Sequence, residues 1–197
     1  MRIEIDKKSG LVIGVIAVLF FALGIAVTGG NDRDGMMGWM RFGGSSTTDF
    51  SANDIMFAQM MIPHHQQAVT MSDLAFKNST SPDVRALAKQ IKGAQAPEIA
   101  QMKKWLSKAG ATMLGAHGMT MDGMLSAKQL SSLAAAQGPA FDRLFLQSMI
   151  THHEGALAMI SMISNSKNLE ARTLAKNIEV SQSAEIELMK KLLASTR

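Results

Sequence analysis

The chain has 197 residues, of which 47% are hydrophobic and 18% charged, and its formal net charge is +4. It contains 17 methionines and five histidines but no cysteine, which excludes disulfides, thiolate metal sites, iron–sulfur clusters and cysteine nucleophiles. The longest basic run is a pair of lysines, so the charge pattern gives no footprint for nucleic acid and we expect no such partner. Any soft metal ligand must be a methionine sulfur.

Residues 11–28 predict a single transmembrane anchor. An unbroken apolar run fills 11–27, long enough for about 26 Å of helix, and basic residues precede it within 1–10. The positive-inside tendency then places 1–10 in the cytoplasm and everything after the anchor outside it. A signal peptide and a buried core helix are the alternatives. A Gly-rich segment with three methionines, 29–48, follows as a flexible linker.

The remaining chain, 49–197, predicts an all-α four-helix bundle of the ferritin-like type, made of two repeated helical hairpins. The stretch FAQMMIPHHQQAVTM from Phe57 aligns with FLQSMITHHEGALAM from Phe145 at an offset of 88 residues. After one deletion the second helices also match, so the copies cover about 54–109 and 140–195. Each hairpin carries one apolar stripe, and two hairpins bury both stripes most simply as a bundle.

Capping residues fix where several helices begin. Ser81 and Asn168 are predicted to cap the second helix of each hairpin, with Pro82 at the first helical position. The connector 110–138 begins as a loop rich in Met and Gly. A short helix should follow it, because Ser126 and Gln129 have the spacing of a capping box.

The first helix of each hairpin has a face of histidine and methionine. Residues three, four and seven apart share a helix face, so Met61, His64, His65, Ala68 and Met71 cluster in one copy, and Met149, His152, His153, Ala156 and Met159 in the other. Any one of these side chains alone could be plain core packing. The duplication should place the two faces against each other, and four converging imidazoles indicate a metal centre.

Two glutamates stand where apolar residues are expected. Glu98 and Glu185 interrupt stripes of Leu, Ile and Met, and a buried carboxylate without a partner is costly. The partner could be a metal, or the second ring nitrogen of a metal-binding histidine. A lysine at the helix edge is the alternative. Gln95 and Gln182, three residues earlier, could join the same polar layer.

The ligand types favour copper. Ferritin-like di-iron bundles use Glu-x-x-His, whereas Met61 precedes His64 and Met149 precedes His152 by three residues. Thioether with imidazole suits copper, above all Cu(I). The connector adds His117, Met119 and Met121 as further candidate ligands, although such methionines could instead bind a partner protein.

The residues MMIPHHQQAV and MITHHEGALAM, with EIAQM and EIELM further on, resemble a bacterial family known as domain of unknown function 305. The resemblance covers about 49–194. It implies a ferritin-like four-helix bundle, often exported or membrane-anchored, and the family includes a characterised member that binds copper in the periplasm and supports copper resistance. It also implies metal-binding roles for Met61, His64, His65, Met149, His152 and His153.

These observations predict a copper-binding protein without enzyme activity. It would sit in the bacterial cell membrane by a single span, with its bundle facing the periplasm or the cell exterior. It would sequester Cu(I) or Cu(II), or hand copper to a partner protein. A ferritin-like metal-dependent oxidase and a metal-free envelope adaptor are the alternatives, and motifs for hydrolysis or nucleotide binding are lacking.

Overall fold

The computed structural model describes residues 50–113 and 121–195 of the chain. Within these ranges lie five α-helices, one short 3-10 helix and no strand. In chain order the elements are α1 (Ala52–Asn78), α2 (Pro82–Lys108), α3 (Ala127–Ala135), α4 (Gly138–Met159), the 3-10 helix η1 (Ile160–Met162) and α5 (Leu169–Ser195). The prediction of an all-α fold is confirmed.

The predicted cytoplasmic segment 1–10, anchor 11–28 and linker 29–48 lie outside the described residues. Among the helices that are described, none has both the length and the apolar character that a membrane span requires. The anchor therefore stays a prediction.

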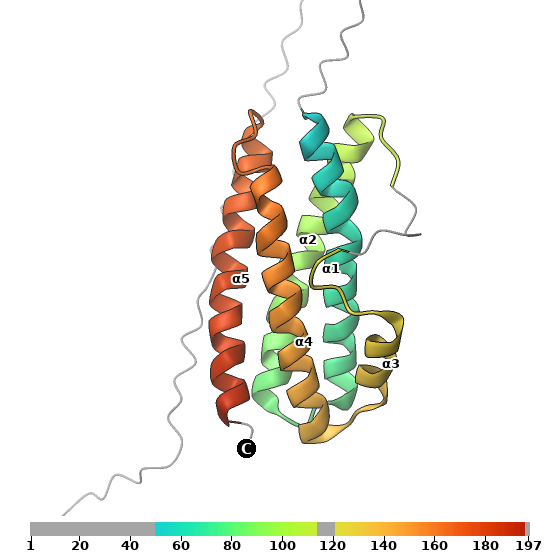
Figure 1. Ribbon diagram of the computed structural model, residues 1–197, viewed down its shortest axis with the longest axis vertical. Coiled ribbons are helices and arrows are strands. Elements are labelled where there is room, and N and C mark those ends of the chain that lie inside the picture. Colours follow the sequence, from blue (N-terminus) through green and yellow to red (C-terminus); the bar gives the residue numbers. More distant parts are fainter. Residues whose placement is uncertain (1–49, 114–120, 196–197) are drawn as a thin grey trace, which may run out of the picture. The chain divides into compact units, whose positions relative to one another are not determined.

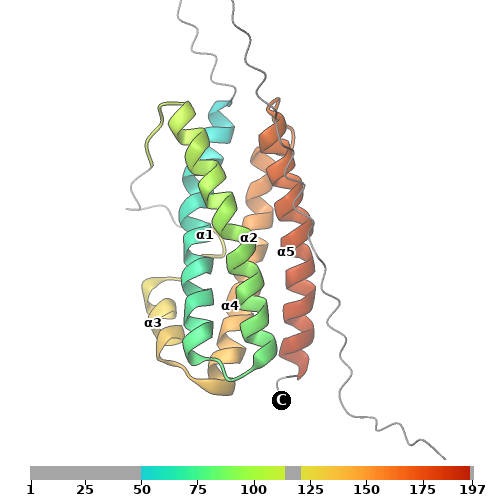
Figure 2. The same ribbon diagram turned by 180° about the vertical axis from the view of Figure 1, so that it is seen from behind.

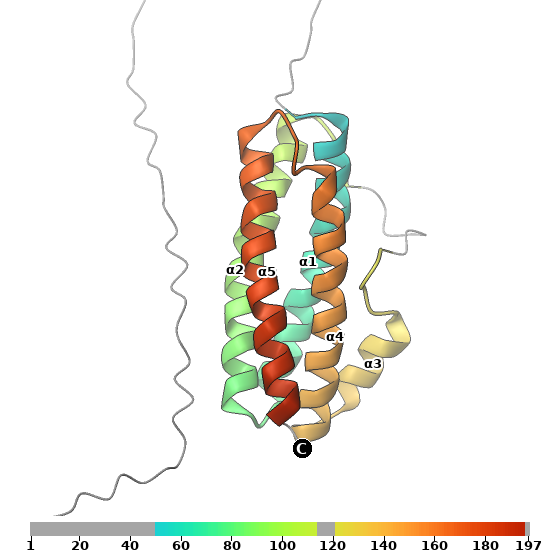
Figure 3. The same ribbon diagram turned by 60° about the vertical axis from the view of Figure 1, so that its left-hand side comes forward.

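The four long helices form a helical bundle built from two hairpins. Helices α1 and α2 pack together as one hairpin, and α4 and α5 as the other (Figure 1). Helix α1 also packs against α4, which joins the hairpins, while α2 and α5 meet on the opposite side (Figure 2). The short α3 lies outside the bundle, against α1 and α4 (Figure 3). The helix pair α1 and α4, which carries the duplicated histidines, therefore lies between α3 and the second helices.

The predicted caps begin the helices where expected. The Ser81 hydroxyl accepts a hydrogen bond from the backbone N–H of Val84 at the start of α2, with Pro82 in the first turn. The side chain of Asn168 accepts one from the Ala171 N–H at the start of α5. At α3 the predicted capping box between Ser126 and Gln129 is present in full.

The two copies differ in their first helices. Helix α1 runs for 27 residues and continues through Pro63, whereas α4 is 22 residues long and passes into η1. The difference lies between the two aligned blocks of the repeat, where the sequence offset changes from 88 to 87 residues. The faces that carry the histidines lie before this point and are preserved in both copies.

The core consists of two apolar clusters, and each of the four long helices contributes to both. The Trp105 cluster includes Phe57, Met61, Met102, Trp105, Met159 and Ile178. The Phe145 cluster includes Met71, Leu87, Phe141, Phe145, Met149 and Met189. Going along each helix from one cluster to the other, the chain passes through a pair of polar residues. The core is thus divided by one polar layer.

Candidate metal centre

The polar layer takes two residues from each long helix. Its members are His64 and His65 of α1, Gln95 and Glu98 of α2, His152 and His153 of α4, and Gln182 and Glu185 of α5. The pairs occupy equivalent positions in the two copies of the hairpin. All four histidines are completely buried. Burying this many polar groups in one layer is costly unless each one has a partner or a ligand.

His64 and His152 face each other across the seam between α1 and α4. Their ring centroids are 3.8 Å apart and the ring planes are inclined by 40°. The Nε2–H of His64 donates to the main-chain carbonyl of Asp122, at 3.2 Å, in the connector. Of the four predicted imidazoles, these two are therefore the ones in direct contact across the repeat.

His65 and His153 each turn toward a glutamate of their own hairpin. The Nε2–H of His65 donates to Glu98 and that of His153 to Glu185, both at 2.8 Å. The prediction that each glutamate in the apolar stripe has a partner is confirmed, and the partner is a histidine rather than a lysine. The two pairs differ in exposure, because the side chain of Glu98 is 15% exposed and that of Glu185 only 2%.

His64, His65 and His153 each use one ring nitrogen in a hydrogen bond, which leaves the other ring nitrogen free. With Nε2–H donating to an oxygen, a neutral imidazole has its lone pair on Nδ1. The Nδ1 atoms of His64, His65 and His153 are buried without a hydrogen-bond partner in the described part of the chain, and so are both ring nitrogens of His152. Buried polar atoms are rarely left this way unless water or an ion completes them. The layer thus holds five unpartnered imidazole nitrogens.

Burial keeps the two central histidines neutral. Desolvation lowers the pKa of His64 from 6.5 to about 3, with the charge of a protonated His65 acting in the same direction and the bond to Asp122 opposing it. Burial also lowers the pKa of His152 well below its usual value, helped by the neighbouring histidines and opposed by the main chain of His64. Neutral imidazole is the form that binds metals.

The four methionines predicted as ligands are all buried in the core beside the layer. Met61 and Met159 lie in the Trp105 cluster, and Met71 and Met149 lie in the Phe145 cluster. Since Met61 is one helical turn before His64, and Met149 one turn before His152, a thioether borders the central pair on each side. Burial alone is equally consistent with packing, so the ligand role stays a prediction.

The other predicted members of the layer are also in place. Gln95 and Gln182 are each 2% exposed, and amide atoms of both lack a hydrogen-bond partner within the described ranges. Among the described residues, no group of three or more His, Asp or Glu side chains is arranged to hold a metal ion.

Of the three candidate ligands predicted in the connector, one lies within the described residues. His117 and Met119 lie outside the described residues. Met121 is half-buried and directly precedes Asp122, whose carbonyl meets His64. The connector thus returns to the bundle at the central histidine pair.

Sequence reasoning missed three residues around the layer: Gln67 and Gly155, which contact the connector, and Gln90, which contacts Glu185. Gln67 makes two hydrogen bonds to the main chain of Leu125. Gly155 leaves room for the Asp122 carbonyl, and Gln90 of α2 donates to the second oxygen of Glu185 at 3.2 Å. Gln67 and Gly155 occupy equivalent positions of the repeat, but several neighbouring positions differ as well, so no signal in the sequence singled them out.

Known structures support the same family assignment as the sequence motifs. The family model described as a domain of unknown function (DUF305) matches residues 54–193. A DUF305 fragment from Deinococcus radiodurans is similar with 29% identity and a TM-score of 0.68, covering 74% of this chain and 97% of that one. Comparison with the curated proteins gave no match.

Structures of the protein CopM are similar as well. CopM in the Cu(I)-bound form is 36% identical, with a TM-score of 0.62, and the match covers 72% of this chain and 96% of that one. CopM in the Cu(II)-bound form is 34% identical, with a TM-score of 0.64, over 73% and 97% of the two chains. With its family model, its fold and its paired histidine motifs in agreement, the chain belongs to the DUF305 family.

Proposed function

We propose that this protein binds copper in the polar layer of its bundle, between α1 and α4, and serves bacterial copper homeostasis by sequestering the metal or passing it on. The observation that carries the proposal is the set of five buried imidazole nitrogens without a hydrogen-bond partner in the described ranges. Each costs stability unless a ligand uses its lone pair or its N–H. Copper structures of CopM, at 34–36% identity, support the same class of ligand.

The donor set explains why copper is the expected metal. Nδ1 of a neutral histidine and the thioether of Met61 or Met149 are borderline and soft ligands, which suit Cu(I) and, for the imidazoles, Cu(II). Glu98 and Glu185 do not need to touch the metal. Each would instead hold a histidine in the tautomer that leaves Nδ1 free, which is the common role of a carboxylate behind a metal-binding histidine.

The ferritin-like oxidase has less support. A di-iron site of that kind needs several carboxylates around the metals, and each of the two carboxylates of the layer is engaged with one histidine. Iron in protein purified from its native host would nevertheless revive this alternative.

The proposal is tested by copper titration of the purified full chain, with and without reductant, against a competing chelator. The double variant His64→Gln, His152→Gln should weaken binding by about 100-fold or more, ~2.7 kcal/mol. The control is Gln95→Leu, Gln182→Leu, which alters two equally buried polar residues of the same layer that are not proposed ligands. Wild-type affinity and stoichiometry in the histidine variant would contradict the site.

The membrane anchor, the extracytoplasmic location and a copper-receiving partner protein belong to the same proposal. Residues 11–28 would hold the bundle at the outer face of the cell membrane, and 29–48 would be a flexible linker between the anchor and the bundle. If so, the full chain should remain in the membrane fraction after alkaline washing, and protease added outside spheroplasts should cleave it. A chain that starts after residue 28 should be released, and retention of that shortened chain would argue against the anchor.

A further inference from the structure

We propose that Gln67 and Gly155 are positioning residues, which hold residues 121–125 across the α1–α4 seam so that the Asp122 carbonyl fixes the ring of His64. Residues 121–125 are called the cover segment below. Its geometry stands on the structure alone, while its consequence for copper rests on the function proposed above.

On the α1 side, the cover segment is held by one side chain with two hydrogen bonds. The amide Nε2 of Gln67 donates to the carbonyl of Leu125 at 2.9 Å, and its Oε1 accepts from the Leu125 N–H at 2.7 Å. Gln67 is three residues after His64, so both side chains lie on one face of α1. The same helix face therefore hydrogen-bonds to the segment at two points, Leu125 and Asp122.

On the α4 side, two glycines allow the cover segment to pack closely against the helix. A Cβ atom on Gly155 would overlap the carbonyl group of Asp122, which is main chain and cannot swing away as a side chain could. Gly123 has a φ of +81°, and a Cβ there would lie 2.5 Å from the carbonyl oxygen of Thr151 and 3.0 Å from the Cα of His152. Backbone thus packs directly on backbone beside the central histidine pair.

The two positioning residues occupy equivalent positions in the two copies of the repeat. Gln67 and Gly155 are related by the offset of 88 that also relates His64 to His152. In the first copy this position is a glutamine that hydrogen-bonds to the cover segment, and in the second it is a glycine that leaves room for it. The central histidines differ in the same way, because the Asp122 carbonyl accepts a hydrogen bond from His64 and not from His152.

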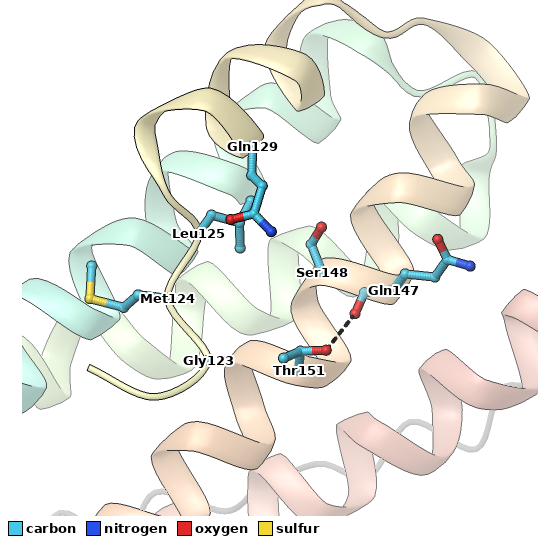
Figure 4. A pocket seen from close by; sticks show the side chains of 7 residues that line it. All are labelled: Gly123, Met124, Leu125, Gln129, Gln147, Ser148 and Thr151. Carbon is cyan, nitrogen blue, oxygen red and sulfur yellow. Dashed lines mark hydrogen bonds between the residues drawn. The ribbon is translucent and has the colours of Figure 1, made fainter. Parts of the chain in front are cut away.

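The cover segment also separates the histidines from solvent at this point. Figure 4 shows an open pocket on the bundle surface, with Met124 and Leu125 of the segment on one wall and Ser148 and Thr151 of α4 on the other. Gly123 lines this pocket and packs on the backbone of His152. Displacing the segment would therefore free the ring of His64 from its acceptor and expose the central pair from this side.

The first test reads the tautomers of the four buried histidines by nitrogen NMR of the metal-free, ¹⁵N-labelled full chain. Wild type should show His64 with its proton on Nε2. Gln67→Ala and Gly155→Ala should each turn His64 into a mixture of tautomers, while His65 and His153 keep the Nε2 proton that their glutamates accept. The controls are Gln66→Ala, an exposed neighbour, and Gly93→Ala, where a Cβ would meet nothing within 4 Å.

The second test measures copper release into excess chelator from the loaded full chain. Both positioning variants should release copper about ten-fold faster or more, with unchanged stoichiometry, as expected for loss of a group that orients a ligand. Gln67→Ala keeps the proposal testable if Gly155→Ala does not fold. Unchanged tautomers and release rates in Gln67→Ala would overturn the proposal even if wild type binds copper. A tautomer change in a chain that binds no copper would support the positioning role and contradict the proposed function instead.

Discussion

His64 and His152 occupy equivalent positions in two copies of one hairpin, and their ring centroids lie 3.8 Å apart in the centre of the bundle. A proton on either ring would place a charge beside the other and in a site without water access. The contact between the two rings is favourable only while both are neutral, because a proton on either ring would be a buried charge without a partner. The metal-free protein therefore has a stability that depends on pH through this pair.

We expect the metal-free protein to lose stability as pH falls from about 7 toward 5. Burial lowers the pKa of His64 to about 3 and that of His152 well below its usual value, whereas an unfolded histidine titrates near 6.5. Below that pH the unfolded chain takes up protons that the folded chain does not. The free energy of unfolding should then fall by up to about 1.4 kcal/mol per pH unit for each histidine.

Urea denaturation followed by circular dichroism, with chelator present, measures this slope at pH 5, 6, 7 and 8. Acidic side chains also titrate at the lower end, so the informative quantity is the difference from the variant His64→Gln, His152→Gln. That variant should show a clearly smaller slope between pH 5 and 7. Equal slopes would mean that the two central histidines become protonated in the folded bundle.

The two glutamates of the layer should differ in their effect on stability. Glu185 accepts from His153 and also from Gln90 of the other hairpin, and its side chain is 2% exposed. Glu98 accepts from His65 and its side chain is 15% exposed, so water can partly take over as the hydrogen-bond acceptor when the carboxylate is removed. Glu185→Ala should therefore cost about 2–4 kcal/mol and Glu98→Ala about 1–2 kcal/mol.

Gln90→Ala completes a double-mutant cycle with Glu185→Ala, measured by chemical denaturation. Because Gln90 acts on Glu185, its removal should cost much less in the Glu185→Ala background than in wild type. Additive losses would show that the contact between the two hairpins at this point contributes no stability.

Much of this fold could be predicted because its signals are local or repeated. The caps at Ser81, Ser126 and Asn168 depend on a few adjacent residues, and the helix pairs follow from apolar periodicity within each copy. The polar layer was visible as an anomaly, since Glu98 and Glu185 stood in apolar stripes. A carboxylate in such a position has to find a partner, and here the partner is a histidine of the same hairpin.

The path of the connector could not be predicted in the same way. Gln67 meets Leu125 and His64 meets Asp122 across 58 residues of chain, and neither contact follows from a local pattern. The early end of α4 at Met159 is likewise set without a capping side chain at the 3-10 turn that follows. Such features depend on how a loop packs on a finished bundle, and periodicity carries no information about that.

The last prediction separates ligand methionines from packing methionines. Met61→Leu and Met149→Leu remove the sulfur nearest the central histidines along each helix, while Met102→Leu and Met189→Leu change two equally buried methionines of α2 and α5. Leu has nearly the volume of Met, so each substitution should change stability by less than about 1.5 kcal/mol. Only the first pair should weaken Cu(I) binding, by about ten-fold or more, ~1.4 kcal/mol.

Cu(I) affinity is measured for all four variants by competition with a colorimetric Cu(I) chelator under reductant, and Cu(II) affinity in parallel without it. Because thioethers prefer Cu(I), the first pair should lose less affinity for Cu(II) than for Cu(I). If Met102→Leu and Met189→Leu weaken Cu(I) binding as much as the first pair, the effect comes from core packing. The buried sulfurs of Met61 and Met149 would then fill space beside a centre made of imidazoles alone.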